Sequence, residues 1–135
     1  MSYKIEQIEG VGPAYAEKLA TAGILTTDHL LARCGTPAGR QSVETMTGLS
    51  GNQILTWTNQ ADLMRVSGIG SEFGQLLESS GVDTVKELAL RNPENLVHAM
   101  ERINEEKKLT RVVPALKTVE KWVDSAKELE PMLTH

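Results

Sequence analysis

Apolar residues recur along this chain at the spacing of one helix face, whereas the sustained apolar–polar alternation typical of strands is absent. One apolar stripe, within residues 50–65, comprises Ile54, Trp57, Ala61 and Met64. Another, within residues 114–129, comprises Leu116, Val119, Trp122, Ala126 and Leu129. Because each tryptophan lies within such a stripe, both are expected to anchor a core. The pattern predicts an all-α fold.

Capping residues predict where the helices begin and end. Proline is favoured at the first helical position, Ser, Thr and Asn at the N-cap, and glycine just beyond the last turn. The first helices are expected from Pro13 to Gly23, from Thr26 or Thr27 to about Cys34, from Thr36-Pro37 to near Gly48, and from Ser50 to residue 65. The later ones are expected over 71–80 and 85–91, from Asn92-Pro93 onward, and from Pro114 to residue 129.

The sequence repeats itself at an offset of 58 residues. The stretch IEGVGPAYAEKLATAGI (8–24) aligns with VSGIGSEFGQLLESSGV (66–82), and each contains a glycine, an aliphatic residue and a second glycine in succession. The identical pairs are Gly10/Gly68, Gly12/Gly70, Leu19/Leu77, Gly23/Gly81, Thr26/Thr84, Leu30/Leu88 and Arg33/Arg91. A repeat at a fixed offset predicts two copies of one supersecondary unit.

The final helices of the two copies align at an offset of 65, which places Trp57 on Trp122. The second copy therefore carries seven extra residues (65 − 58), expected within INEEKKLTRVV, residues 103–113. The helix at 50–65 closes the first copy and runs directly into the Gly68-Ile69-Gly70 turn of the second copy. We therefore expect two units, residues 1–65 and 50–135, stacked through this shared central helix.

The repeated turn resembles the helix-hairpin-helix motif, whose outline is h-x-x-h-x-G-h-G-x-x-x-A-x-x-h, where h is apolar. The first copy places on it Ile5, Ile8, Gly10, Val11, Gly12, Ala16 and Leu19. The second places on it Leu63, Val66, Gly68, Ile69, Gly70, Gly74 and Leu77, with Gly74 for the usual alanine. Nearly the whole chain also resembles a small bacterial family of tandem helix-hairpin-helix proteins that is catalogued as a domain of unknown function. The resemblance implies two tandem helix-hairpin-helix units and brings no established activity.

The chemistry of such a turn suits a phosphate group. We expect positive φ at Gly12 and Gly70, with the aliphatic residue between the two glycines of each turn filling the core. The following helix presents unpaired N–H groups and a partial positive charge, which together form an anion site. The resemblance implies non-specific binding of the DNA backbone there. The candidate residues are Gly10, Gly12, Gly68 and Gly70, with Lys18 as a nearby cation.

The alternative is that the turns only pack two helices at a sharp angle. Pro13 lacks an N–H group where the first turn would donate one. DNA-binding members of the motif usually follow the turn with a lysine or arginine, whereas this chain has Pro13-Ala14 and Ser71-Glu72. Glu9 and Glu72 also add negative charge beside the turns. With purely structural turns, the chain would be a protein-interaction or adaptor module.

Positive charge is concentrated in residues 107–121, KKLTRVVPALKTVEK, which we call the basic segment. It carries a net charge of +4 (5 − 1) in a chain whose formal net charge is −4. Its cations are Lys107, Lys108, Arg111, Lys117 and Lys121. Such a patch predicts weak contact with DNA or another nucleic acid, or with an acidic protein partner. The alternative is a solvated face whose cations pair with Glu101, Glu105 and Glu106.

Enzyme chemistry finds little support in the sequence. The three histidines have no metal-ligand spacing with Cys34 or with carboxylates, and no phosphate-binding loop, nucleophile elbow or dinucleotide fingerprint is present. Cys34, the only cysteine, permits no intrachain disulfide, and no apolar run is long enough to span a membrane. We expect a non-catalytic, cytoplasmic module without cofactor, metal or membrane partner. A weaker alternative is an accessory domain to an enzyme on another chain.

Overall fold

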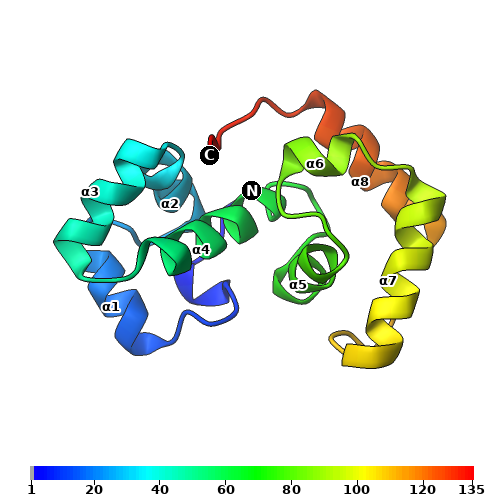
Figure 1. Ribbon diagram of the computed structural model, residues 1–135, viewed down its shortest axis with the longest axis horizontal. Coiled ribbons are helices and arrows are strands. Elements are labelled where there is room, and N and C mark those ends of the chain that lie inside the picture. Colours follow the sequence, from blue (N-terminus) through cyan, green and yellow to red (C-terminus); the bar gives the residue numbers. More distant parts are fainter. Residues whose placement is uncertain (1) are drawn as a thin grey trace.

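A computed structural model describes residues 2–135, and within them the chain is all-α, as the apolar pattern predicts (Figure 1). A short 3-10 helix, η1 (Ile5–Gln7), precedes eight α-helices. These are α1 (Pro13–Thr21), α2 (Thr27–Cys34), α3 (Pro37–Thr47), α4 (Gly51–Leu63), α5 (Ser71–Ser79), α6 (Val85–Ala89), α7 (Pro93–Lys107) and α8 (Leu116–Glu128). The only strand-like pairing in the described part is an isolated antiparallel bridge between Lys4 and Thr26.

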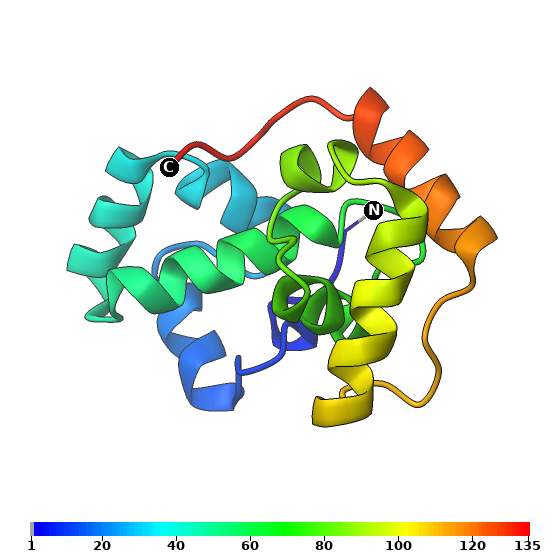
Figure 2. The same ribbon diagram turned by 45° about the vertical axis from the view of Figure 1, so that its right-hand side comes forward.

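The helices form two groups that lie side by side, α1 to α4 in one and α5 to α8 in the other (Figures 1 and 2). In the first group, α2 and α3 pack on α4, and α1 packs on α3. In the second, α6 and α7 pack on α8, and α5 packs on α7. The two groups meet where α4 contacts α5.

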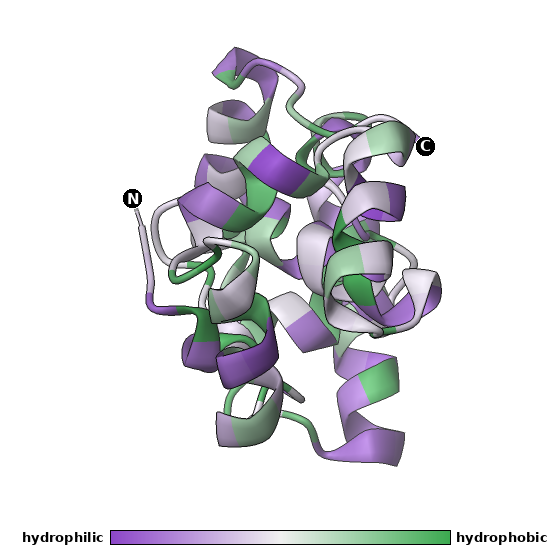
Figure 3. Cartoon of the chain, turned by 90° about the vertical axis from the view of Figure 1, so that its left-hand side faces the viewer, coloured by the Kyte–Doolittle hydropathy of each residue, from purple (hydrophilic) through white to green (hydrophobic). Residues whose placement is uncertain are grey.

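Each group has its own cluster of buried apolar side chains. Green and purple residues alternate along most helices in Figure 3, as expected where one side of a helix is buried and the other is exposed. Helix α4 contributes Ile54, Trp57 and Ala61 to the first cluster, as does its C-cap residue Met64, and it contributes Leu63 to the second. The division into two units that share this helix stays a prediction, and α4 faces mainly the first cluster.

The two copies of the repeat have closely matching geometry. Gly10 and Gly68 have φ angles of 89° and 94°. The ring of Tyr15 lies 5.3 Å from that of Trp57 at an interplanar angle of 54°, and Phe73 lies 5.4 Å from Trp122 at 55°. Both tryptophans are buried, at 5% and 2% exposure, so the expectation that they anchor the core is confirmed.

Polar side chains of α4 join the two groups. Asp62 is buried; its Oδ2 accepts a hydrogen bond from the Val85 N–H at 2.8 Å, and its Oδ1 lies 2.9 Å from Nη1 of Arg65. Gln60 donates from Nε2 to the carbonyl of Gly74 at 3.1 Å and to the carboxylate of Glu78 at 2.7 Å. Hydrogen bonds from α4 therefore hold both α5 and the start of α6.

The residues after α8 run back across to the first group, where the C-terminal end lies near α2 and α3 (Figure 1). The Thr134 N–H donates to the carbonyl of Gly35 at 2.7 Å. The buried Arg40 donates from Nη2 to the carbonyl of Thr134 at 2.7 Å and from Nη1 to that of Cys34 at 2.9 Å. This tail therefore connects the second group to the first, separately from α4.

Two sequence-based expectations about local structure are wrong. Gly12 and Gly70 have φ angles of −82° and −101°, because each is the extended N-cap residue of its helix, and the positive φ falls instead on Gly10 and Gly68. The final helix begins at Leu116, not Pro114. Leu116 therefore lies in its first turn, where it is 38% exposed and not on the buried face.

We expect serine at Gly68 to lower the free energy of unfolding by about 1–3 kcal/mol, because a side chain is strained at a φ of 94°. Serine at Gly70 is expected to leave this free energy unchanged or raise it by roughly a few tenths of a kcal/mol, because serine suits an extended N-cap. Urea denaturation of both variants measures the difference. Equal losses would show that the backbone at Gly70 also requires glycine.

Candidate functional site

The two Gly-aliphatic-Gly turns, residues 10–12 and 68–70, are called the glycine turns. Each is fixed by the aliphatic residue at its centre. Val11 and Ile69 are buried at 4% and 0% exposure. Their N–H groups donate to the carbonyls of Ile8 and Val66, in both cases at 3.1 Å. The flanking Gly10 and Gly68 are exposed. The turn is therefore anchored from within, while its glycines lie at the surface.

The helices that follow the two glycine turns begin without a side-chain cap, at Gly12 for α1 and Gly70 for α5. Four other helices are capped, as predicted, by the side chains of Thr26, Thr36, Ser50 and Asn92, and α6 is capped by Thr84, the counterpart of Thr26. A Cβ placed on Gly12 or Gly70 would meet no atom within 4 Å. The first amides of α1 and α5 therefore have no side-chain acceptor, and the space beside each N-cap glycine is open to an external one.

The backbone of the glycine turns favours binding of an anion, but the side-chain charges around them favour it less. Lys18 lies in the last turn of α1, so it is about 9 Å along the helix from Gly12. The guanidinium of Arg65, just before the second turn, is engaged by Asp62 and by the carbonyl of Glu130 at 2.7 Å. Glu9 and Glu72 are exposed beside the turns. Of the two cations nearest to the turns in sequence, Lys18 therefore lies a helix length away and Arg65 is already engaged.

All five cations of the basic segment are exposed, and none forms an ion pair with any group in residues 2–135. The only ion pairs in that part of the chain are Arg65–Asp62 and Arg91–Glu87. The predicted pairing with Glu101, Glu105 and Glu106 is therefore wrong, because these cations extend into solvent from the end of α7, the following loop and α8. They remain available to an external anion.

The extra residues of the second copy lengthen both α7 and the loop after it. Helix α7 has 15 residues, against 11 in α3. Its C-cap residue is Lys108, which has a φ of 51° and is the only non-glycine residue with positive φ in the described part. Asn104 then pairs with the backbone of Thr110, its Nδ2 donating to the carbonyl and its Oδ1 accepting from the N–H, both at 3.0 Å. This clamp holds the loop that carries Lys108 and Arg111.

Replacing Lys108 by glycine is expected to raise the free energy of unfolding by about 0.5–1 kcal/mol, because glycine adopts a left-handed conformation at less cost. The first copy already has glycine at the corresponding helix end, Gly48, with a φ of 75°. Thermal or urea unfolding of the variant tests this. A loss of stability would show that the Lys108 side chain makes a contact that outweighs the backbone strain.

The first glycine turn and the end of α7 lie along the same edge of the molecule, the lower edge in Figures 1 and 2. Lys107 and Lys108 are at that edge. Lys117 and Lys121 are spaced four residues apart on α8 and thus share a helix side. The predicted candidates therefore occupy two kinds of surface, the glycine turns and the basic segment.

The family of the chain follows from sequence comparison. The model of a family described as a domain of unknown function, DUF4332, matches residues 9–129. The chain belongs to this family. No curated protein and no solved structure matches it.

Other candidate chemistry in this DUF4332 protein is limited. Burial raises the pKa of the Cys34 thiol to about 11, despite the opposing charges of Arg33 and Arg40, so the thiol stays protonated at neutral pH. His29 and His98 are exposed helix residues, as predicted. No group of three or more His, Cys, Asp or Glu residues in residues 2–135 is placed to hold a metal ion. No helix of that range has the length and apolar character to cross a bilayer.

Sequence reasoning missed the residues that position the basic segment of the DUF4332 chain. Asn104 and Thr110 form the clamp described above, and Thr110 also donates from Oγ1 to the carbonyl of Val112 at 2.9 Å. An asparagine six residues before a threonine does not match any recognised sequence motif. The available indication was the sequence insertion itself, because an added loop needs its own backbone hydrogen bonds.

Proposed function

We propose that this DUF4332 protein is a non-catalytic module that binds the backbone of nucleic acid through the basic segment. The observation that carries the proposal is that five exposed cations there have no ion-pair partner within residues 2–135. The chain without this segment has a formal net charge of −8 (−4 − 4). Contact with a polyanion is therefore local, and unpaired cations concentrated at the end of α7, on the following loop and on α8 support it.

We further propose that the two glycine turns are helix-hairpin-helix turns that add a second, weaker contact to phosphates. The uncapped starts of α1 and α5 support this, because their amides can donate to backbone oxygens without reading bases. Glu9 and Glu72 weaken that contact, so the basic segment contributes more.

The proposed ligand is duplex nucleic acid. Proteins that bind single strands without sequence preference stack the bases on aromatic rings. None of the tyrosine, phenylalanine and tryptophan side chains in residues 2–135 is fully exposed: Trp57 and Trp122 are buried, and Tyr3, Tyr15 and Phe73 are half-buried. A duplex needs only phosphate contacts, which lysine and arginine supply.

Titration of a fluorescently labelled DNA duplex with the full chain tests this function. At about 50 mM salt we expect dissociation constants of about 10⁻⁴–10⁻⁶ M, with no dependence on sequence and a steep loss at about 200 mM salt. A single strand of the same length should bind no more tightly. Absence of duplex binding at the lower salt concentration would overturn the proposal.

A protein partner is the second candidate, and one observation favours it. Val112 and Leu116 are apolar side chains of the basic segment that remain 69% and 38% exposed. A phosphate group gains nothing from contact with an apolar side chain, whereas an acidic protein segment that contains an apolar residue can pack against one. A partner retained by wild type and released by a Val112→Ser, Leu116→Ser variant would support this candidate. Equal retention would exclude this surface as the binding site.

A reducing, cytoplasmic setting also remains part of the proposed function. It is supported by the single cysteine, Cys34, which is fully buried and can form no intrachain disulfide. Fractionation of cells that express the tagged chain tests the location. Recovery of the chain outside the cytoplasm would contradict it.

A further inference from the structure

We propose that each glycine turn binds a phosphate-like oxyanion between the uncapped helix start and the indole N–H of the tryptophan beneath the turn. Trp57 serves the first turn and Trp122 the second. The inference deepens the proposed function, on which it rests for the source of the oxyanion, a phosphodiester. It adds two donor side chains that sequence reasoning assigned to the core alone.

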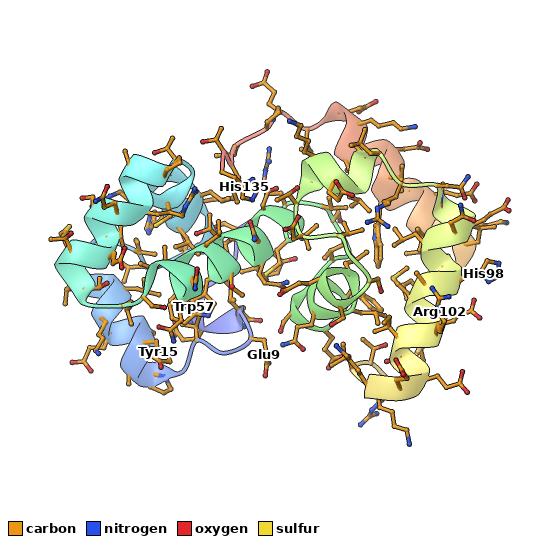
Figure 4. The ribbon with its side chains drawn as sticks, in the orientation of Figure 1. Glu9, Tyr15, Trp57, His98, Arg102 and His135 are labelled. Atoms are coloured by element: carbon orange, nitrogen blue, oxygen red, sulfur yellow. The ribbon has the colours of Figure 1, made fainter. Side chains whose placement is uncertain are left out.

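The two indole nitrogens lie directly against the glycine turns. A Cβ placed on Gly10 would be 3.6 Å from Nε1 of Trp57, and one placed on Gly68 would be 3.1 Å from Nε1 of Trp122. In Figure 4, Trp57 lies below α4 next to Tyr15. The rings of Tyr15 and Phe73 pack against the tryptophans at 5.3 and 5.4 Å between centroids, which fixes each indole orientation.

Both indole N–H groups lack an acceptor within residues 2–135, although their side chains are at least nine-tenths buried, with 5% and 2% exposure. The only side-chain atoms of that range that are both unpartnered and sealed from solvent are Asn59 Oδ1 and Gln60 Oε1. The indole N–H groups therefore reach the surface at the turns. A buried tryptophan usually finds a hydrogen-bond partner, and here an external acceptor can supply it.

The N-caps of the uncapped helices lie two residues beyond Gly10 and Gly68, and in the proposed sites these helix starts supply the other donors. The amides that follow Gly12 and Gly70 have no side-chain cap, and the space above both glycines is open to 4 Å. Because both copies of the repeat combine an open glycine N-cap with an unpartnered indole, the arrangement occurs twice in one chain. Several neutral N–H donors at a helix start favour an oxyanion over a cation or a neutral ligand.

The second glycine turn has one more N–H donor than the first, but the charge beside it is less favourable to an anion. Ser71 retains the N–H that Pro13 lacks at the equivalent position. Glu72, in the first turn of α5, is exposed and repels an anion at that helix start. Without this carboxylate, the second turn would be the stronger of the two sites.

The test uses the two indole N–H signals of the ¹⁵N-labelled full chain in nuclear magnetic resonance spectra. Trp57→Phe and Trp122→Phe variants assign the two signals. We expect both signals to shift in a saturable manner on addition of inorganic phosphate, and at lower concentration on addition of an unlabelled duplex. Chloride at matched ionic strength is the control. Indole signals that do not respond to phosphate would overturn the inference.

Three variants of the second turn sharpen the test. Trp122→Phe is expected to weaken phosphate binding at that turn about 3- to 10-fold, read from neighbouring amides, while the first turn is unaffected. Glu72→Gln is expected to strengthen it about 2- to 5-fold. Gly70→Ser keeps the extended N-cap and supplies its own cap, so it should abolish binding at the second turn in a folded protein. Unchanged binding in Gly70→Ser would contradict the inference even if Trp122→Phe does not fold.

This inference and the proposed function can fail separately. Glutamates at Lys107, Lys108 and Arg111 remove the basic segment as a site and leave both turns intact. Phosphate-dependent indole shifts that persist in this variant support the turns as independent sites. Loss of the shifts would show that phosphate binds only to the basic segment.

Discussion

Replacing Lys107, Lys108 and Arg111 with glutamate is expected to abolish duplex binding at low salt. The change removes three unpaired, exposed cations and puts three repelling carboxylates on the same loop. Each phosphate contact contributes a salt-dependent increment, so the loss of three leaves little affinity. The free energy of unfolding is expected to change by no more than about 0.5 kcal/mol, because these side chains are at the surface. Fluorescence titration and urea denaturation measure the two effects.

A matched control separates local contact from net charge. Both the variant and a control with glutamate at Lys4, Lys86 and Lys127 have a formal net charge of −10 (−4 − 6). The control residues are exposed and lie outside the basic segment. We expect the control to retain most of the duplex affinity. If both triple variants lose binding equally, the effect is one of overall charge, and if neither loses it, the glycine turns carry the contact.

Replacing Asp62 with alanine is expected to lower the free energy of unfolding by about 2–4 kcal/mol. Its side chain is only 4% exposed, and removal would leave two groups without their partner: the Val85 N–H and the Arg65 guanidinium, whose side chain is 13% exposed. The substitution also breaks a connection between α4 and the start of α6. Urea denaturation, followed by circular dichroism and by tryptophan fluorescence, measures the loss.

The Arg91–Glu87 pair offers the control for Asp62. Its side chains are 34% and 39% exposed, and it joins residues of the same segment, so Glu87→Gln should cost only about 0.3–0.5 kcal/mol. A similarly small loss for Asp62→Ala would show that α4 does not hold the second group through this carboxylate. Two separate transitions in the Asp62 variant would show that the two groups of helices unfold independently once it is removed.

The parts of the fold that depend on neighbouring residues could be predicted from sequence. Thr26, Thr36 and Ser50 cap the helices expected of them, because a cap involves residues only two or three positions apart. The repeat predicted the paired roles of Trp57 and Trp122. It did not identify which glycine takes positive φ, because both glycines of a Gly-x-Gly turn are compatible with either conformation.

Contacts between distant segments could not be predicted, and Gly74 illustrates why. On the motif outline it is a small residue in place of alanine. In the structure, a Cβ there would lie 2.5 Å from Oε1 of Gln60, so this glycine makes room for a buried side chain from α4. The indole N–H groups were missed for the same reason: a helical stripe predicts that a tryptophan is buried and not where its one polar atom points.

The bond between the tail and Gly35 also sets an order of events during protein synthesis. The Thr134 side chain and N–H both contact the Gly35 carbonyl, across a separation of 99 residues. A ribosome adding about 5–20 residues per second takes roughly 5–20 s to produce that partner. Until then, the Arg40 guanidinium in the nascent first half lacks the Thr134 carbonyl that it bonds in the finished chain. The first half of the chain, although it is synthesised first, therefore reaches its full stability only after Thr134 has been made.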